Sequence, residues 1–442
     1  MQTRNDTQKL SLINGIIHTP TSTASCITFE HGRIVSIDDE AAALNGKVID
    51  LQGKTVLPAF CDTSLDFFGW AEDQERLSLS TVRSLQEFTG ALTAYQQSNP
   101  EPLRGWYIAQ GLPESVNISR DDIDAVIPSR PCAVIGAKRT HAVLNTPAMS
   151  EFNMPQDNIE LDGLAQHLPP LSTNDILYLI RTYSPKVNAL GISEVWIDAY
   201  TDAGKIWDIF SSEAYGELSF RVRLNFGFDE VISMNEFLAS GLRTGDGLPM
   251  CRLGGILVRD DLKQEDQKNM ITSAHLSGCQ VIADNSQYSI NVLERIIKKF
   301  PKNPRHLVRS SSFNSKLIDR MRILGLGGIS TSSSEDNELH SAFMNGIVIS
   351  AGSGQVLASP MKKTGLMVSA GLSVAEAVSV YSWASAWNGS TEMRRGELTV
   401  GNDADVAVAE KDPFSAKPEE IAGIDVAMTF CAGVKVYDKN DS

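Results

Sequence analysis

The spacing of apolar residues predicts two kinds of element that alternate along most of the chain. From residue 174 onward, short apolar runs typical of buried strands alternate with stretches in which apolar residues recur every three or four positions. The last of these helical stretches covers residues 374–387. Strands that alternate with helices form parallel sheets. The predicted strands cover residues 193–199, 219–227, 252–260, 279–285, 305–310, 327–332 and 347–353.

An earlier stretch predicts an eighth strand at the start of this series. In LPAFCDTSLDFFGW (57–70), an apolar run leads into alternating polar and apolar residues, as at the end of a strand. Eight strands separated by helices predict an α/β fold, a (β/α)8 TIM barrel, with its chemistry at the carboxyl ends of the strands. Mixed helix and strand patterns at about 72–170 predict an elaborated segment after the first strand.

The two ends of the chain share a pattern of short apolar runs and tight turns. His31-Gly32, Gln52-Gly53 and Ala432-Gly433 stand between such runs and fit hairpin turns. A barrel flanked by β segments predicts one small β-sandwich built from the N- and C-terminal segments. We expect the sandwich to comprise residues 1–57 and 391–442, and the barrel residues 58–390.

Composition and net charge restrict the kinds of molecule that the protein could bind. The net charge of -15 argues against nucleic acid or an anionic membrane as the main partner, and no run reaches the roughly 18 apolar residues of a membrane span. The N-terminal residues MQTRNDTQKL lack the apolar core of a signal peptide, and six scattered cysteines indicate free thiols in a reducing compartment. We therefore expect a cytoplasmic protein with a small-molecule ligand, and a homodimer as the default assembly.

Several stretches resemble the amidohydrolase superfamily, in particular its N-substituted formamide deformylase-like branch. They are GKTVLPAFCDTSLDF, RGWYIAQGLPE, SRPCAVIGAKRTHAVLNTPAM, VNALGISEVWIDA and the long run from SVAEAVSVYSWASAW to VGNDADVAVAEKDPF. The last run is similar to the signature that closes the family's barrel and returns to its sandwich. The resemblance implies a metal-dependent hydrolase of carbon–nitrogen bonds other than peptide bonds, in which a bound metal activates water.

This chain departs from the family pattern wherever the resemblance implies a metal ligand. Family members have an H-x-H pair, a lysine, two further histidines and an aspartate at successive strand ends, and this chain has no H-x-H pair. His306 lies on the strand of the last family histidine, but four residues too early. The positions that match the family's ligands are Ser64, Asp66, Leu257, Ile282, Ser310 and Gly354.

Two functions therefore remain open. The resemblance implies an amide hydrolase, with zinc or another divalent metal as cofactor if that activity survives. The loss of ligands favours a catalytically silent member that binds a small molecule or a protein and needs no cofactor, because leucine, isoleucine and glycine side chains cannot hold a metal. Asp66 is the one weak metal candidate. A different site in the same barrel mouth is a third possibility.

Other candidates come from position alone. His141 matches a family histidine near the substrate, although a partly buried structural histidine is an equal alternative. Asp198 and Asp260, with Asp261 and Asp284, lie at the carboxyl ends of predicted strands, where they would form an acidic mouth or, more commonly, cap helices. Lys138 with Arg139 would bind an anion or be solvated. The serine-rich stretches 310–315 and 331–336 would line a polar pocket or form turns.

Overall fold

The computed structural model describes residues 9–39, 46–152, 157–161, 164, 167–200, 203–212, 214–302, 304–331 and 337–441. The chain divides into two compact units. The barrel unit comprises Met1–Phe67 and Ile180–Ser442, and the inserted unit comprises Phe68–Leu179.

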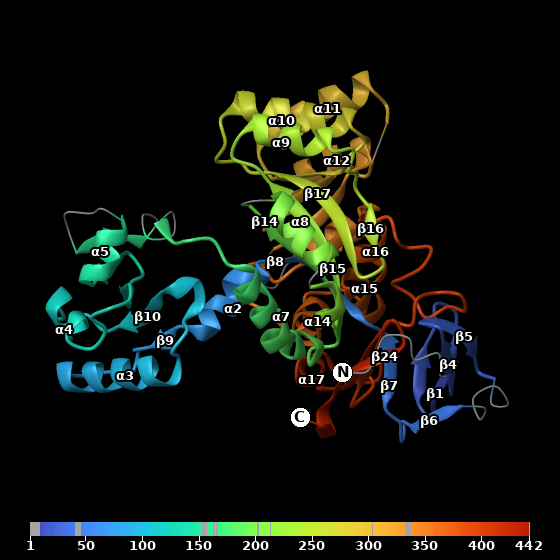
Figure 1. Cartoon of the computed structure of the whole chain (residues 1–442). Coiled ribbons are helices and arrows are strands. Elements are labelled where there is room, and N and C mark those ends of the chain that lie inside the picture. Colours follow the sequence, from blue (N-terminus) through green and yellow to red (C-terminus); the bar gives the residue numbers. More distant parts are fainter. Residues whose placement is uncertain are drawn as a thin grey trace. The chain divides into compact units, whose positions relative to one another are not determined.

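Eight parallel strands form the central sheet of the barrel unit (Figure 1). Each pairs with the next strand of the series, and an isolated bridge between Leu65 and Gly354 links the last strand to the first. The predicted (β/α)8 barrel is therefore confirmed. A short strand, β16 (Gly247–Leu248), adds to β17 in antiparallel fashion. The barrel strands are β8 (Phe60–Leu65), β14 (Ile192–Ala199), β15 (Arg221–Gly227), β17 (Cys251–Val258), β18 (Val281–Asp284), β19 (Leu307–Ser310), β20 (Gly327–Ser330) and β21 (Ile349–Ala351).

Helices separate these strands, and local sequence signals set their ends. α11 begins after Ser286, whose hydroxyl accepts a hydrogen bond from the backbone N–H of Ser289, and it buries an apolar face. α12 ends at Gly325, whose φ of 64° suits glycine. The elements are α7 (Thr173–Asn188), α8 (Ala203–Ser211), η2 (Tyr215–Glu217), α9 (Val231–Ala239), α10 (Gln264–Leu276), α11 (Gln287–Lys299), α12 (Ser315–Leu324), α13 (Asn337–Met344), α14 (Pro360–Ser369), α15 (Val374–Val380), α16 (Trp383–Asn388) and α17 (Pro418–Ile421).

The single helix predicted over residues 374–387 is wrong, because the structure has two. α15 and α16 are separated at Tyr381 and Ser382, and Ser382 has φ -129° and ψ -89°, outside the helical region. The hydroxyls of Ser382 and Ser385 donate to the carbonyls of Val378 and Val380. Serine side chains thus supply hydrogen bonds where the helical ladder is interrupted.

Strands from both ends of the chain form the two sheets of the β-sandwich, which confirms that part of the fold. Their facing residues share one core, in which Phe29 meets Phe430 edge to face with 5.9 Å between ring centroids. One sheet has the order β5 (Arg33–Ile37), β4 (Ile27–Glu30), β1 (Leu10–Ile13), β6 (Lys47–Asp50); the other has β24 (Val434–Asp438), β23 (Val426–Cys431), β22 (Val406–Ala409), β7 (Thr55–Pro58), β2 (Ile16–His18), β3 (Thr23–Ala24). A short turn of helix, η3 (Lys439–Asp441), follows β24.

Two of the three predicted hairpin turns join paired strands. His31-Gly32 connects β4 to β5, and Ala432-Gly433 connects β23 to β24, each with positive φ at both residues, as a tight hairpin requires. The prediction of a hairpin at Gln52-Gly53 is wrong. That dipeptide also has positive φ at both residues, but it connects β6 of one sheet to β7 of the other.

The inserted unit has its own sheet with an apolar cluster on each face. Alternate residues of one segment divide between the clusters: Tyr107 and Ala109 lie in one, Trp106 and Ile108 in the other. The sheet order is β13 (Asn158–Glu160), β12 (His141–Leu144), β11 (Cys132–Gly136), β10 (Tyr107–Leu112), β9 (Leu77–Ser78), and the helices are α2 (Phe67–Glu75), α3 (Leu85–Ser98), η1 (Leu103–Gly105), α4 (Arg120–Asp124) and α5 (Thr146–Phe152).

A buried ion-pair network ties the barrel to the segment that precedes β22. Arg221 on β15 donates to both carboxylate oxygens of Asp405, at 2.8 and 3.1 Å, and lies 3.4 Å from Asp403. Arg395 bridges Asp403 and Glu194 with contacts of 2.9 Å each. The five side chains are between 4% and 12% exposed. Because these charges are shielded from water, removing one of them would leave its partner buried without a counter-charge.

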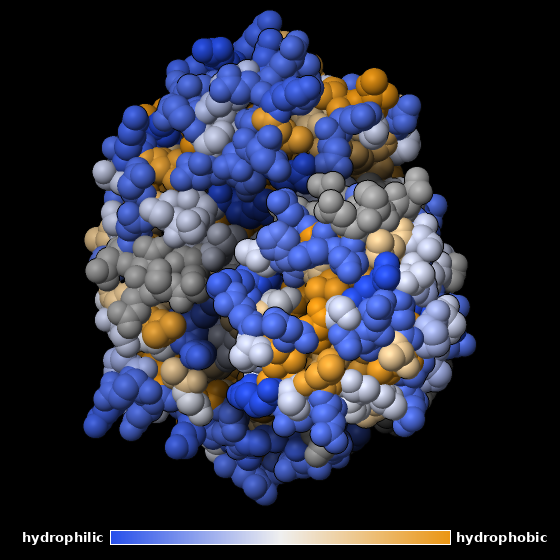
Figure 2. Space-filling view, turned by 90° about the vertical axis from the view of Figure 1, so that its left-hand side faces the viewer, coloured by the Kyte–Doolittle hydropathy of each residue, from blue (hydrophilic) through white to orange (hydrophobic). Residues whose placement is uncertain are grey.

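The surface that Figure 2 shows is largely polar and the cysteine side chains are buried, as the composition predicts. Hydrophilic residues cover much of the face shown in Figure 2, interspersed with apolar patches. All six cysteines are buried. Within the part of the chain that the structure describes, no helix is long and apolar enough to span a membrane.

Candidate functional site at the barrel mouth

Apolar side chains fill the barrel interior, so polar groups that could react or bind lie at the carboxyl ends of the strands. We call this end of the barrel the barrel mouth. Leu257 and Ile282, two positions where the resemblance implies metal ligands, are 1% and 2% exposed. They offer no donor atom and belong to a cluster of buried side chains from six strands, with Tyr200 packed against it. The cluster comprises Cys61, Trp196, Leu257, Ile282, Leu307 and Ile329.

Above this cluster, an arginine on β19 joins carboxylates from two other strands. The Arg309 Nη1 atom lies 2.6 Å from Asp198 Oδ2, at the end of β14, and its Nε atom lies 2.7 Å from Asp284 Oδ1, at the end of β18. The guanidinium group also donates to the Tyr200 hydroxyl at 3.3 and 3.4 Å. We call Arg309, Asp198, Asp284 and Tyr200 the arginine cluster.

Neighbouring residues hold the arginine cluster in place. Asn225 donates from Nδ2 to the second oxygen of Asp198 at 3.0 Å and accepts the backbone N–H of Gly255 at 2.9 Å. A side chain at Gly254 would come within 2.0 Å of Asn225 Oδ1, and one at Gly227 within 2.4 Å of the Tyr200 ring. Glycine is therefore required at both positions for these side chains to reach the mouth.

The arginine cluster is strongly charged and partly shielded from water. The side chains of Asp198, Arg309 and Asp284 are 8%, 17% and 21% exposed. Burial alone would lower the pKa of Arg309, but Asp198, Tyr200 and Asp284 more than offset this, so its pKa is raised. Burial raises the pKa of Asp198, and the guanidinium opposes that shift. The 2.6 Å contact is typical of a charge-assisted hydrogen bond, so we treat the pair as ionised.

Ser64, Asp66 and Gly354 lie together where the barrel closes. The backbone N–H of Asp66 donates to the Gly354 carbonyl at 2.8 Å, and the Gly354 N–H donates to the Ser64 carbonyl at 2.6 Å. Ser64 is 5% exposed, whereas Asp66 is exposed at the mouth. The Asp66 charge is close enough to raise the pKa of Asp198 slightly, behind the larger effects of burial and Arg309.

The other predicted mouth residues serve the local structure. The Ser310 hydroxyl donates to the Ser312 carbonyl at 2.5 Å and accepts from Asn285 at 3.0 Å. The Asp260 carbonyl accepts a hydrogen bond from Gln267. Asp261 pairs with Arg259 at 3.1 Å. The predicted serine-rich stretch 331–336 lies outside the described residues except for Thr331.

His141 and the neighbouring cations belong to the inserted unit. His141 is exposed at the start of β12, where it pairs with Glu160 across the sheet. Lys138 contacts Glu114 at 2.5 Å, and Arg139 lies 3.7 Å from Asp73. Both cations therefore have carboxylate partners, as exposed side chains commonly do.

His306 forms a buried pair with His275. Its Nδ1 atom accepts the backbone N–H of Val281 at 2.9 Å, which leaves Nε2 to donate to His275 Nδ1 at 2.8 Å. The second His275 nitrogen then donates to the Phe300 carbonyl at 2.9 Å. Every ring nitrogen has a partner with both rings neutral. Burial, and to a lesser degree His275, lowers the pKa of His306 to about 3.

The side chains that the structure describes do not fit a catalytic metal ion. Within the described ranges, no group of three or more His, Cys, Asp or Glu side chains could hold a metal. Asp198 and Asp284, two carboxylates of the barrel mouth, already bind the Arg309 guanidinium. A metal would have to displace a cation that both carboxylates contact. No chemical step is therefore assigned to a metal in this barrel.

A second buried carboxylate lies on β8. Asp62 is 1% exposed, and its Oδ1 atom accepts the backbone N–H groups of Ser353 and Ser64 at 2.9 and 3.2 Å. Lys363 donates to the nearby Gly352 carbonyl at 3.0 Å. Burial raises the pKa of Asp62 to about 6, although its hydrogen bonds and Lys363 oppose the shift.

Replacing Asp62 with asparagine is expected to stabilise the protein increasingly as pH rises. The folded pKa of about 6 lies above the usual 3.8, so the carboxyl stabilises the fold while protonated and loses that contribution as pH rises from 4 through 6. The asparagine side chain would keep the acceptor oxygen without the charge. Urea unfolding at pH 4 to 7.5 should show D62N gaining up to about 3 kcal/mol relative to the natural chain.

The matched control is Asp121→Asn, because the Asp121 side chain is 82% exposed. Its difference from the natural chain should not change with pH. A pH-independent difference for D62N as well would contradict a buried, titrating Asp62.

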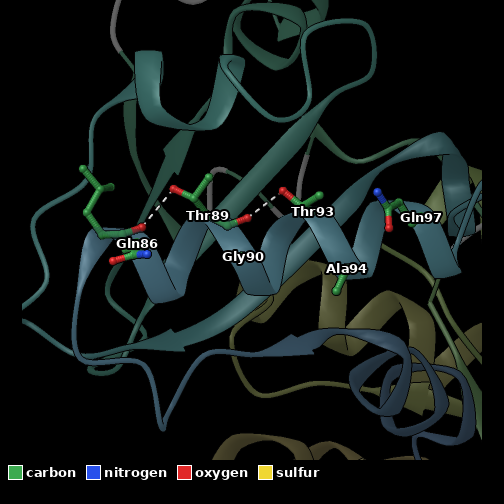
Figure 3. A pocket seen from close by; sticks show the side chains of 7 residues that line it. Gln86, Thr89, Gly90, Thr93, Ala94 and Gln97 are labelled. Carbon is green, nitrogen blue, oxygen red and sulfur yellow. Dashed lines mark hydrogen bonds between the residues drawn. The ribbon is translucent and has the colours of Figure 1, made fainter.

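A wide, shallow hollow of about 890 Å³ lies on α3 of the inserted unit (Figure 3). The hydroxyls of Thr89 and Thr93 turn back to the carbonyls of Leu85 and Thr89 at 2.9 and 2.7 Å. No titratable side chain lines the hollow among the described residues, so it is a poor candidate for chemistry. Its lining residues are Leu85, Gln86, Thr89, Gly90, Thr93, Ala94 and Gln97.

The site residue that sequence reasoning missed is Arg309. It shares the strand face of Leu307, which packs into the barrel interior, because alternate residues of a strand lie on the same face. The neighbouring Ser310, which was matched to the family histidine, lies on the other face. Strand alternation in HLVRS was the available signal, since it places the arginine two residues after the inward leucine.

Comparison with known proteins agrees with this architecture. The sequence pattern of the Amidohydrolase family matches residues 47–162 and 341–437. The protein named "Putative amidohydrolase YtcJ" from Bacillus subtilis (strain 168) is 21% identical, covering 89% of this chain and 90% of its own length. The N-substituted formamide deformylase of Arthrobacter pascens is 27% identical over 173 residues, or 36% of this chain and 30% of its own.

A solved structure shows the same fold. The crystal structure of an uncharacterized metal-dependent hydrolase from Pyrococcus furiosus superposes with a TM-score of 0.77 and 17% identity. The match covers 92% of this chain and all of the other. At that identity the similarity supports a shared fold only, and the chemistry has to be inferred from the residues of this chain.

Proposed function

The chain belongs to the amidohydrolase superfamily, and from this premise we propose that it does not catalyse metal-dependent hydrolysis and instead binds a small molecule at its barrel mouth. The observation that carries the proposal is the Arg309 guanidinium bonded to Asp198 and Asp284. A metallohydrolase needs ligands that donate electron pairs to a metal and a free carboxylate that takes the proton from water.

The mouth nevertheless offers a polar binding surface. Tyr200 and Arg309 are partly exposed polar groups above an apolar floor formed by Leu257 and Ile282. Binding sites for small molecules combine an apolar lining with a few fixed polar groups in this way.

Hydrolysis of a carbon–nitrogen amide bond is the competing function. It is supported by the similarity to the YtcJ relative over most of the chain and to the formamide deformylase over about a third of it. Under this alternative, Asp66 and a displaced arginine cluster would have to supply the metal site.

Metal analysis of the purified protein separates the two functions. After growth with added zinc and manganese, we expect far less than one equivalent of bound metal, no effect of a chelator on thermal unfolding, and no cleavage of amides or N-substituted formamides. A thermal-shift screen of small molecules should then find stabilising ligands, with a gain of about 2.7 kcal/mol at 100 times the Kd. Near-stoichiometric metal whose removal lowers stability would instead establish the hydrolase.

A further inference from the structure

We propose that the Arg309 guanidinium is the resident cation of the barrel mouth and closes a carboxylate site that would otherwise take a divalent metal ion or a free guanidinium ion. The inference rests on the proposed function, because it concerns a chain that carries no metal. It explains why the barrel mouth would not bind a metal ion, and it predicts a substitution that would restore cation binding.

Carboxylates from different strands converge on the Arg309 guanidinium. Asp198 and Asp284 come from β14 and β18, which are separated in the sheet by β15 and β17, yet both contact one guanidinium group at 2.6 and 2.7 Å. Carboxylates from separate strands meet here around a single cation. Oxygen ligands of this kind are those that hard divalent cations prefer.

Arg309 supplies a positive charge that offsets the carboxylates of the barrel mouth. The charges of Asp66 and Asp284 each raise the pKa of Asp198, and the Arg309 guanidinium contacts both Asp198 and Asp284. Without Arg309, Asp198 and Asp284 would be left as shielded carboxylates with no cation, a costly arrangement. A cation from solution would relieve that cost, so removing the arginine should create affinity for cations.

The carboxylate site should persist without the arginine side chain. Asn225 fixes one oxygen of Asp198 and is itself held by the Gly255 N–H. The room for Asn225 depends on Gly254, and none of these contacts involves Arg309. Asp198 should therefore keep its position in a variant that lacks the arginine side chain.

The test compares the natural chain with Arg309→Ala. Calorimetric titration with Mn²⁺ should show binding by R309A at least about tenfold tighter than by the natural chain. Guanidinium chloride at low millimolar concentration should raise the Tm of R309A relative to sodium chloride at equal ionic strength, and leave the natural chain unchanged. The double variant D198N/R309A should lose both gains.

Two controls separate charge from size and position. Arg309→Lys keeps a cation and should bind neither Mn²⁺ nor guanidinium. Arg322→Ala removes an arginine that pairs with the exposed Asp319, and it should behave like the natural chain. If R309A does not fold, Arg309→Gln keeps the bulk without the charge and should show the same cation dependence more weakly.

The outcomes distinguish this inference from the proposed function. Stoichiometric metal in the natural chain would overturn the proposed function and this inference with it. A metal-free natural chain, with R309A and R309Q that gain no affinity for either cation, would overturn this inference alone. Equal binding by R309A and D198N/R309A would also overturn it, because the cation would then lie elsewhere.

Discussion

Replacement of Asp405 with alanine is expected to lower the free energy of unfolding by about 3–5 kcal/mol, the usual cost of removing one partner from a buried ion pair. Asp405 accepts two hydrogen bonds from Arg221, which is 4% exposed, and the backbone N–H of Ala432 at 2.7 Å. In the variant, the Arg221 charge would keep only Asp403 at 3.4 Å as its carboxylate partner. The β23–β24 turn would lose a hydrogen bond as well.

Urea unfolding at pH 7, followed by circular dichroism, measures this cost. The matched control is Asp319→Ala, which breaks an ion pair with Arg322 whose two side chains are about 60% exposed, and it should change stability by less than about 0.5 kcal/mol. Equal effects of the two substitutions would mean that the network contributes no more than a surface pair.

The His275–His306 pair is expected to make the fold sensitive to acid. The pKa of His306 falls from 6.5 to about 3 in the fold, so the neutral pair stabilises the protein fully above pH 6.5 and loses that contribution as pH falls toward 3. The full difference corresponds to roughly 4–5 kcal/mol. Protonation of His306 would add a proton and a charge at Nδ1, the atom that already accepts the Val281 N–H, while Nε2–H already donates to His275.

The variant His306→Asn tests this directly. Its side-chain oxygen can accept the Val281 N–H, but it has no ring to titrate, so the loss of stability between pH 6.5 and 4 should shrink even though stability at pH 7 decreases. Urea unfolding across that range gives the slope. His31→Asn, at an exposed turn with φ of 51°, is the control and should keep the natural slope. An unchanged slope for H306N would assign the acid sensitivity to other groups.

The strands of the barrel could be predicted because each combines an apolar run with a following helical period, and this pattern is local. The break between α15 and α16 could not be predicted, because serine hydroxyls replace backbone hydrogen bonds there without a proline or glycine to mark it. The role of Gln52-Gly53 also depended on distant partners. Its residues adopt the conformation of a hairpin turn, but β6 pairs with β1 and β7 pairs with β2 and β22.

The candidate site could be predicted only in part. Position at strand ends identified Asp198 and Asp284, and the missing histidines indicated an altered site. The ion pairs of these aspartates with Arg309 span 111 and 25 residues of sequence, and no local pattern encodes such a contact. Ser310, the residue that the resemblance selects on β19, is the immediate neighbour of Arg309 and lies on the other face of the strand, because consecutive residues of a strand face opposite sides.

The β-sandwich combines strands from both ends of the chain, so it cannot form until the ribosome has synthesised the C-terminal strands. β7 must pair with β22, and about 350 residues separate Pro58 from Val406. At roughly 5–20 residues per second, a ribosome needs roughly 20 to 70 seconds to supply the missing partner. Throughout that interval, Leu12, Phe29 and Val56 lack much of the core that buries them, and β7 presents an open edge. The yield of folded protein should therefore depend on elongation rate and on chaperones that shield the nascent N-terminal strands.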